Sequence, residues 1–239
     1  MKTIFVTFIV IFFIFTSAAF TQQKAIKNSG YTRMEERAVE DFNKIKTTRS
    51  IKVFLTQGET ISVKVQADTN LLPYIKTTVI DHLLQLTIPD KVKTKPNQEI
   101  NVYITLPIIK ELHASTSAEI KSMTIWKVDE LDLSASTSGE IEIEVNANQL
   151  NTKASTSGEI TLKGTANSLY TRATTSGEIK ATELEAQQVS AQASTSGEIK
   201  IYVTKKLEYN VSTGGEIHYK GSPLLNGRAN GNGKILRIE

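Results

Sequence analysis

The chain has 239 residues, no cysteine, and 28 lysines and arginines against 25 acidic residues, which gives a net charge of +3. The lack of cysteine excludes disulfide scaffolds, thiolate zinc sites and thiol catalysis. The balanced charge gives no sign of a nucleic-acid or anionic-membrane partner. Six of the eight phenylalanines lie within the first twenty residues, so we expect a core built from Ile, Leu, Val, Ala and Thr.

The chain begins with the features of an export signal. A short basic start precedes an apolar run from Ile4 to Phe15, and Ser17-Ala18-Ala19 supplies the small residues of a cleavage site. The alternative is a membrane anchor, but this run is shorter than the ~20 residues that a spanning helix needs. We predict a signal peptide over residues 1–19, cleaved near Ala19 to Gln22.

Export implies that the mature chain resides in the periplasm, on the outer-membrane surface or outside the cell. A lipid-anchored protein carries a cysteine directly after its signal peptide, and this chain has none. We therefore expect neither a lipoprotein nor a transmembrane segment in the mature chain.

Two segments follow before the chain becomes regular. Residues 20–37 are polar and predict no element, whereas residues 38–110 alternate in hydropathy and predict an irregular β cap with the first turns of a larger fold. The strand-like runs are Phe42 to Ile45, Ser50 to Leu55, Thr60 to Ala67, Ile75 to Ile80, Leu84 to Ile88 and Glu99 to Leu106. Gln57-Gly58-Glu59 predicts a tight turn that pairs the strands on either side of it. Asp90 to Asn97 predicts a mobile loop.

Residues 111–239 contain one heptapeptide seven times. The copies run from Ala114 to Ile120, Ala135 to Ile141, Ala154 to Ile160, Ala173 to Ile179, Ala193 to Ile199, Val211 to Ile217 and Ala229 to Ile235. Five of them read Ala-Ser/Thr-Thr-Ser-Gly/Ala-Glu-Ile, and the closing isoleucines are 18 to 21 residues apart. Leu131, Leu150, Leu169, Val189, Leu207 and Leu225 recur four residues before a copy.

The repeat predicts a solenoid of strands. Within a copy, Leu150, Thr152, Ala154 and Thr156 fall on one face and Ser155 on the other, which is a period of two and not of 3.6. A repeat of this length holds about three short strands, or one turn of a parallel β-helix. Because parallel crossovers are overwhelmingly right-handed, we predict an all-β, single-stranded, right-handed parallel β-helix of about seven turns.

The glycines of the repeat, such as Gly158, mark the corner between strands. A corner favours glycine either because φ is positive there or because no Cβ fits. Ala118 at the first corner argues against a strict requirement for positive φ. Both explanations remain open from the sequence.

The chain resembles a known family, described as putative auto-transporter adhesin, head GIN domain. The resemblance rests on Phe42-x-x-Ile45, Val53-Phe-Leu55-Thr-Gln57-Gly58, Leu86-x-Ile88, Ile104-Thr-Leu106-Pro107 and the recurring Ser-Gly-Glu-Ile. It covers about residues 38–239 and implies a β-helix in an exported bacterial protein. The family supplies no catalytic residues to carry over.

The best candidate for a site is a column of glutamates, one per turn. We expect the column and the neighbouring serines to line one outward stripe: Glu119, Glu140, Glu159, Glu178, Glu198 and Glu216, with Ser136, Ser155 and Ser194. Lys121, Lys180 and Lys200 lie two residues further along and would relieve the repulsion between carboxylates. The stripe is either a solvated surface or a binding surface for a glycan or cell-surface polymer. We expect no metal, cofactor or catalytic residue.

Three classes of function are compatible with these features. The first is an exported, non-enzymatic protein that contacts a surface or glycan through a repetitive face, in the manner of an adhesin. The second is a filament subunit that self-associates through the ends of its solenoid. The third is a polysaccharide-cleaving enzyme with pectinase-like architecture, which the lack of room for long inserted loops disfavours. The sequence favours the first.

Overall fold

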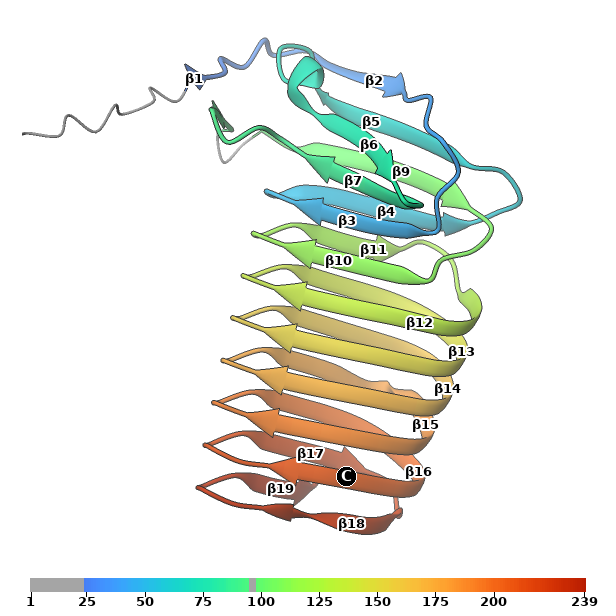
Figure 1. Ribbon diagram of the computed structural model, residues 1–239, viewed down its shortest axis with the longest axis vertical. Coiled ribbons are helices and arrows are strands. Elements are labelled where there is room, and N and C mark those ends of the chain that lie inside the picture. Colours follow the sequence, from blue (N-terminus) through green and yellow to red (C-terminus); the bar gives the residue numbers. More distant parts are fainter. Residues whose placement is uncertain (1–23, 95–97) are drawn as a thin grey trace, which may run out of the picture.

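The computed structural model describes residues 24–94 and 98–239, and these residues form an almost entirely β protein. The predicted signal peptide lies outside the described residues. The only helical element of the described chain is a 3₁₀ turn, η1 (Leu72–Tyr74). Figure 1 shows a tall coil that carries an irregular assembly of strands on its amino-terminal end.

The coil consists of strands that pair in parallel with the strands of neighbouring turns. These strands are β10 (Glu111–Ser115), β11 (Glu119–Ser122), β12 (Trp126–Ser136), β13 (Glu140–Ser155), β14 (Glu159–Thr174), β15 (Glu178–Ser194), β16 (Glu198–Val211), β17 (Glu216–Lys220), β18 (Leu224–Ala229) and β19 (Lys234–Arg237). The chain descends leftward on the near side of Figure 1 and rightward on the far side, which makes the coil right-handed. The predicted parallel β-helix of about seven turns is confirmed.

Each long strand bends and contributes to two sheets. We call the sheet on the near side of Figure 1, which leads into each heptapeptide, the front sheet, and the sheet that follows each corner glycine the back sheet. At the bend, side chains are hydrogen-bonded from turn to turn: the amide of Asn167 donates to that of Asn148 (3.0 Å), the amide of Gln187 to that of Asn167 (3.1 Å) and the ammonium of Lys205 to the Gln187 amide (2.7 Å). This side of the coil is therefore held by side chains as well as by the main chain.

The interior is formed by columns of identical or similar residues. The repeat isoleucines are direct partners across neighbouring turns, and from Ile120 to Ile217 each is completely buried. Thr152 and Thr171 point inward beside the leucine column and are 5% and 3% exposed. The core of aliphatic residues, alanine and threonine that the composition predicts is confirmed.

The corner between the front and back sheets is a four-residue turn whose two central residues have positive φ. In the second copy the N–H of Gly139 donates to the carbonyl of Ser136 (2.9 Å), and φ is +50° at Thr137 and +59° at Ser138. Such a turn ordinarily takes Asn-Gly, because a side chain at positive φ is strained. The prediction that Thr156 faces inward is wrong. Thr156 is a central residue of the same turn in the next copy, with φ of +51°, and its side chain is exposed to solvent.

Glycine is required at the corners that carry it, because no Cβ atom fits there. None of Gly139, Gly158, Gly177 and Gly197 has a positive φ, but a Cβ on Gly158 would lie 2.3 Å from the carbonyl oxygen of Ala135 in the preceding turn. The Gly158 corner is fixed to both neighbouring turns, since the N–H of Glu159 donates to the Gly139 carbonyl (2.9 Å) and the N–H of Ser157 donates to the Thr175 carbonyl (3.2 Å).

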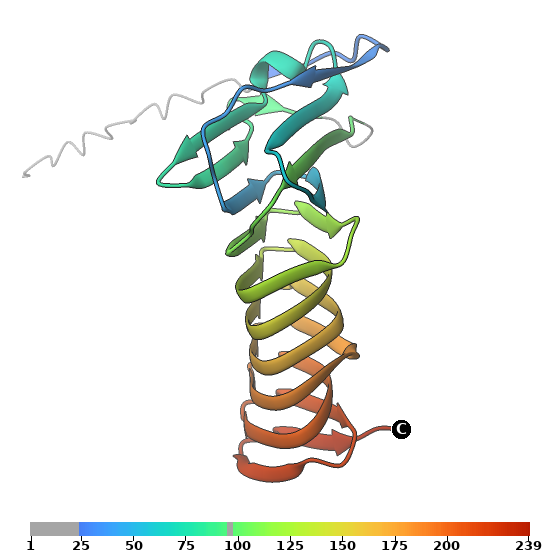
Figure 2. The same cartoon turned by 90° about the vertical axis from the view of Figure 1, so that its right-hand side faces the viewer.

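The cap is built from shorter strands of mixed direction, as the sequence predicts (Figure 2). Its elements are β2 (Thr32–Glu36), β3 (Lys44–Thr48), β4 (Ile51–Gln57), β5 (Ser62–Asp68), β6 (Lys76–Ile80), β7 (Leu83–Thr87) and β9 (Ile100–Leu106). β3 and β4 pair in parallel with β10 and β11 and so begin the coil. The predicted hairpin across Gln57-Gly58-Glu59 is wrong, because β9 pairs with both β4 and β5 and lies between them.

The polar segment before the cap contributes two short strands. β1 (Lys24–Ala25) pairs with β8 (Val92–Lys93), which lies within the segment predicted as a loop, and β2 pairs antiparallel with β5. Asp68 accepts hydrogen bonds from the N–H and hydroxyl of Ser29 (2.7 and 2.8 Å) and from the N–H of Asn70 (2.9 Å). This buried carboxylate fixes the segment to the cap.

We expect Ile160→Asp to abolish folding, because an unpaired charge in a dry column is very costly. The control Ile160→Val should fold with a loss of about 1 kcal/mol in the free energy of unfolding. Circular dichroism and thermal melting distinguish the two variants. A cooperative melt of the aspartate variant near the parent's temperature would contradict the buried column.

Gly158→Ala should destabilise the protein by about 1–3 kcal/mol, because the added methyl would have to displace main chain in the turn above. Ser157→Gly is the matched control, since glycine adopts the positive φ at this position without strain, and we expect its melting temperature to equal or exceed that of the parent. Equal stability of the alanine variant and the parent would show that the corner is not closely packed.

Candidate functional site

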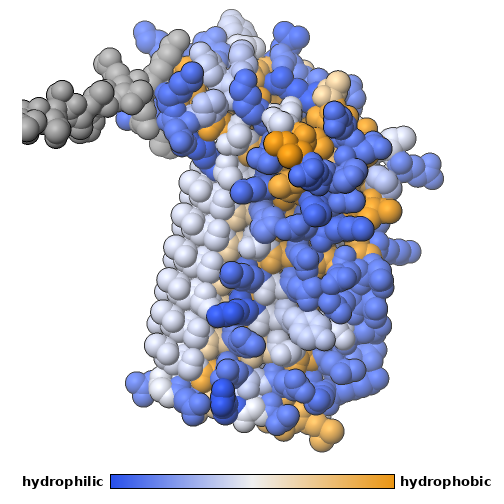
Figure 3. Space-filling model, viewed as in Figure 1, coloured by the Kyte–Doolittle hydropathy of each residue, from blue (hydrophilic) through white to orange (hydrophobic). Residues whose placement is uncertain are grey.

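The most regular exposed feature is the row of corners. We call the ten Thr and Ser residues at the centres of the first five corners the corner ridge: Thr116, Ser117, Thr137, Ser138, Thr156, Ser157, Thr175, Ser176, Thr195 and Ser196. All ten are exposed, and none of their hydroxyls forms a hydrogen bond within the part of the chain that the structure describes. In Figure 3 the ridge appears as the pale column along the left edge. It therefore presents unpaired hydroxyl groups at a spacing of ~4.8 Å per turn.

The predicted glutamates form a column on the back sheet, next to the ridge. Each is the direct partner of the next across neighbouring turns. Five of the side chains, all except that of Glu140, are ion-paired and 27% to 35% exposed. The column is thus brought together as predicted, but most of it is half-buried.

A second column, two residues further along, supplies the counter-charges. The Lys180 ammonium lies 2.6 Å from Glu159 and 3.5 Å from Glu178. Lys200 lies 2.9 Å from both Glu178 and Glu198. The predicted relief of repulsion is therefore present at these turns. Lys121 differs, because its partner is Glu142 at 2.6 Å, outside the glutamate column.

Glu140 and Glu178 occupy the same position in different turns and differ in their electrostatics. Partial burial raises the pKa of Glu140, and the charges of Glu119 and Glu159 raise it further. Burial also acts to raise the pKa of Glu178, but hydrogen bonds and charge from Lys200 and Lys180 outweigh it, and that pKa is lowered. The two lysines that flank Glu178 are replaced around Glu140 by Glu142 and Thr161, and the charge of Glu142 raises the pKa of Glu140 as well.

The predicted serines lie on the other side of the ridge. Ser136, Ser155 and Ser194 end the front-sheet strands and are half-buried, whereas the glutamates begin the back-sheet strands. The residues of the expected outward stripe are therefore divided between the two sheets. The serines, the ridge and the glutamates instead wrap around one corner of the coil.

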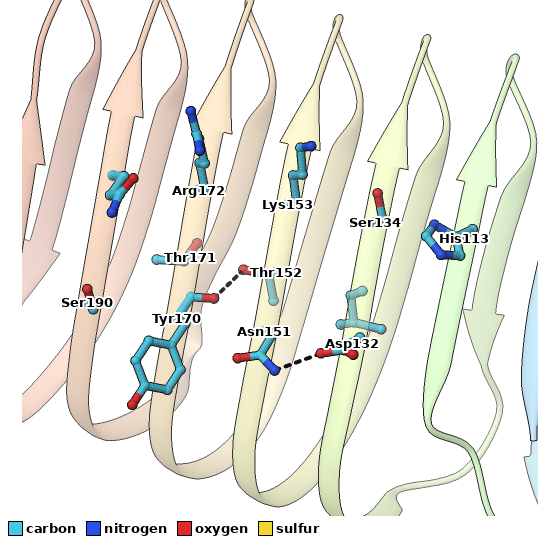
Figure 4. A pocket seen from close by; sticks show the side chains of 12 residues that line it. His113, Asp132, Ser134, Asn151, Thr152, Lys153, Tyr170, Thr171, Arg172 and Ser190 are labelled. Atoms are coloured by element: carbon cyan, nitrogen blue, oxygen red, sulfur yellow. Dashed lines mark hydrogen bonds between the residues drawn. The ribbon is translucent and has the colours of Figure 1, made fainter.

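The front sheet carries a groove that the sequence does not predict. The hollow of about 520 Å³ runs across β10 and β12 to β15, and Figure 4 shows the side chains that line it. The outward-facing residues are His113, Asp132, Ser134, Asn151, Lys153, Tyr170, Arg172, Ser190 and Gln192. In the sequence these residues stand two and four positions before the Ser or Thr that precedes each Thr-Ser pair. They recur at this spacing but differ in type from turn to turn, so no repeated residue marks them.

Two further observations on the described residues concern metal sites and membrane-spanning helices. Among the described residues, no three His, Asp or Glu side chains are arranged to hold a metal ion. No helix within residues 24–94 and 98–239 is long and apolar enough to cross a membrane.

Comparison with known families matches this architecture to one of them. The family described as putative auto-transporter adhesin, head GIN domain, matches residues 41–223. The chain belongs to this family. No curated protein matches the chain.

Solved structures of bacterial proteins share the fold of this GIN-domain chain. A putative adhesin from Bacteroides fragilis is 25% identical with a TM-score of 0.80, and the match covers 88% of this chain and 99% of that one. A putative lipid binding protein from Parabacteroides distasonis is 24% identical with a TM-score of 0.73, over 90% of this chain and all (100%) of that one. A putative adhesin from Parabacteroides merdae is 24% identical with a TM-score of 0.66, over 90% and 99% of the two chains.

Glu140→Gln and Glu178→Gln should change stability in opposite directions at neutral pH. Removing the poorly compensated Glu140 charge should raise the free energy of unfolding, and removing Glu178 from between two lysines should lower it, each by less than about 1 kcal/mol. Thermal melting of both variants beside the parent measures the difference.

Acidification should remove this difference. The contribution of Glu178 exists above the ordinary pKa of 4.5 and is lost as the pH falls through its lowered pKa. The charge on Glu140 disfavours folding above its raised pKa, and that penalty disappears on protonation. A gap between the two variants that persists below both pKa values would contradict the assigned partners.

Proposed function

We propose that this chain is an exported, non-enzymatic contact module of the adhesin type, which binds a glycan or another cell-surface polymer through the corner ridge. The family match and the β-solenoid fold support the general class. The predicted signal peptide supports a location in the periplasm, on the outer-membrane surface or outside the cell, and the lack of cysteine supports a chain without a lipid anchor.

The observation that carries the proposal is the conformational cost of the ridge. Left-handed backbone costs about 1–2 kcal/mol for a residue with a side chain, and each of the first five corners places Thr and Ser there. The last corner, Asn230-Gly-Asn-Gly233, uses residues that adopt this conformation easily. The same turn can therefore form without hydroxyls, and strain that persists at exposed positions points to a function of the side chains.

The geometry of the ridge fits a repetitive partner. A small ligand prefers a concave, mostly apolar pocket, whereas the ridge is convex and polar. Weak contacts that repeat along a polymer add through effective concentration. The glutamate column and Ser136, Ser155 and Ser194 flank the ridge and extend this polar surface to both sides.

A second function, self-association, is favoured by the open end of the coil. Leu224, Leu225 and Leu236 in the last turn are 79%, 47% and 45% exposed. The cap covers the opposite end (Figure 2), so pairing of two open ends would give a closed two-fold dimer and not a filament. Sedimentation equilibrium of the parent and of Leu225→Lys tests this, and a monomeric parent at high concentration would rule it out.

Replacing Ser138, Ser157, Ser176 and Ser196 by glycine tests the ridge. Glycine removes the hydroxyl and relieves the strained φ, so we expect an unchanged or higher melting temperature together with several-fold weaker retention on immobilised dextran and xylan and on whole bacterial cells. The control is Ser62→Gly in the cap, outside the ridge. Undiminished retention of the ridge variant would remove the ridge from the contact surface.

A further inference from the structure

The front-sheet groove contains two cations that the fold leaves uncompensated. Lys153 and Arg172 are direct partners on β13 and β14 and both are exposed. Neither forms an ion pair with any described residue. On the back sheet, by contrast, Lys180 and Lys200 each contact two glutamates. Like charges directly opposite each other on neighbouring strands are destabilising, so this pair lowers stability unless an anion joins it.

Both neighbours of the pair along its column are neutral. The next positions along the same column are Ser134 on β12 and Gln192 on β15. The one carboxylate that lines the hollow is Asp132, which accepts a hydrogen bond from Asn151 (2.7 Å, Figure 4). A carboxylate between Lys153 and Arg172 would therefore meet two positive charges, and guanidinium groups bind carboxylates with two parallel hydrogen bonds.

An aromatic ring lies next to the cations. Tyr170 is two residues before Arg172 on the same outward face of β14, and its side chain is 50% exposed. An exposed tyrosine offers a flat apolar face and a polar hydroxyl, which matches the C–H face and hydroxyl groups of a sugar ring. Asn151, Ser134 and Gln192 add hydrogen-bonding groups around it.

The hollow continues along the axis of the coil. A neighbouring hollow of about 440 Å³ shares Ser190 and Gln192 with the first and extends to Asn226 and Arg228 in the last turn. It is also lined by Glu208, whose carboxylate is paired with the Lys206 ammonium at 2.6 Å. The groove therefore suits an extended chain rather than a single small molecule. It does not suit a nucleic acid, whose regularly spaced phosphates need cations at regular intervals, because Gln192 and Asn210 stand between Arg172 and Arg228 in this column.

We propose that the groove binds an acidic glycan strand along the coil axis, with one uronate carboxylate between Lys153 and Arg172 and a sugar ring on Tyr170. This proposal rests on the proposed glycan-contact function and specifies acidic glycans as the class of ligand. The groove site is separate from the corner ridge, which has no charge of its own.

The test is the binding of oligogalacturonate in solution, measured by isothermal titration calorimetry at low salt. The parent should bind the acid form, and the fully methyl-esterified form, which keeps the sugar and loses the charge, should bind at least tenfold more weakly. Lys153→Gln with Arg172→Gln should weaken binding of the acid form at least tenfold, and Tyr170→Ala should weaken it several-fold. Added salt should also reduce the affinity.

The matched control removes two exposed cations elsewhere, Lys64→Gln with Lys76→Gln in the cap, and should bind as the parent does. Equal binding by the Lys153–Arg172 double variant, or equal binding of acid and ester, would overturn the groove site. A parent that is retained on immobilised polymers through the ridge but does not bind oligogalacturonate would also overturn it, while leaving the adhesin function intact. A parent that binds neither would contradict both.

Discussion

The close approach of main chain to main chain at the corner is the constraint on which the rest of the structure depends. A Cβ on Gly139, Gly158, Gly177 or Gly197 would lie 2.3 to 2.4 Å from the carbonyl oxygen of an alanine in the preceding turn. The hydrogen bond from each following glutamate N–H to the corner carbonyl of that preceding turn fixes the register. With the register fixed at one corner, every other position of the repeat stacks on its equivalent.

Stacking of equivalents has opposite consequences for the interior and the surface. In the interior, it places Ile, Leu and Ala in continuous dry columns, and burial of their apolar surface stabilises every turn. Outside, it brings like charges together at the inter-strand distance, where they repel. The back sheet resolves the conflict at Glu159, Glu178 and Glu198, which pair with Lys180 and Lys200. On the front sheet, Lys153 and Arg172 form no ion pair with a described residue. The lack of counter-charges distinguishes this candidate binding site from the paired charge columns of the back sheet.

The proposed contact surfaces use two properties of the same corner-and-sheet geometry. The ridge supplies hydroxyls at a constant spacing, and its strained backbone is held by hydrogen bonds to the turns on both sides. The groove supplies residues that differ from turn to turn, with one cationic pair and one aromatic ring. A regular ridge suits weak contact with a repetitive surface, and an irregular groove suits recognition of a particular chain.

The sequence by itself determined the β-helix, the number of its turns, the buried isoleucine column and the family resemblance, because a seven-fold repeat with period two leaves few ways to bury its apolar residues. It also predicted the lysine relief of the glutamate column at Lys180 and Lys200. Only the tertiary structure decided why glycine stands at the corner, since close approach and positive φ predict the same residue. It showed that Thr156 turns outward, that β9 lies between β4 and β5, and that the serines and glutamates wrap around a corner. These features depend on backbone conformation and on contacts between residues distant in sequence, which period-two patterns do not encode. The groove could not be predicted for a related reason. Its residues come from five turns and share a surface only after the turns have stacked.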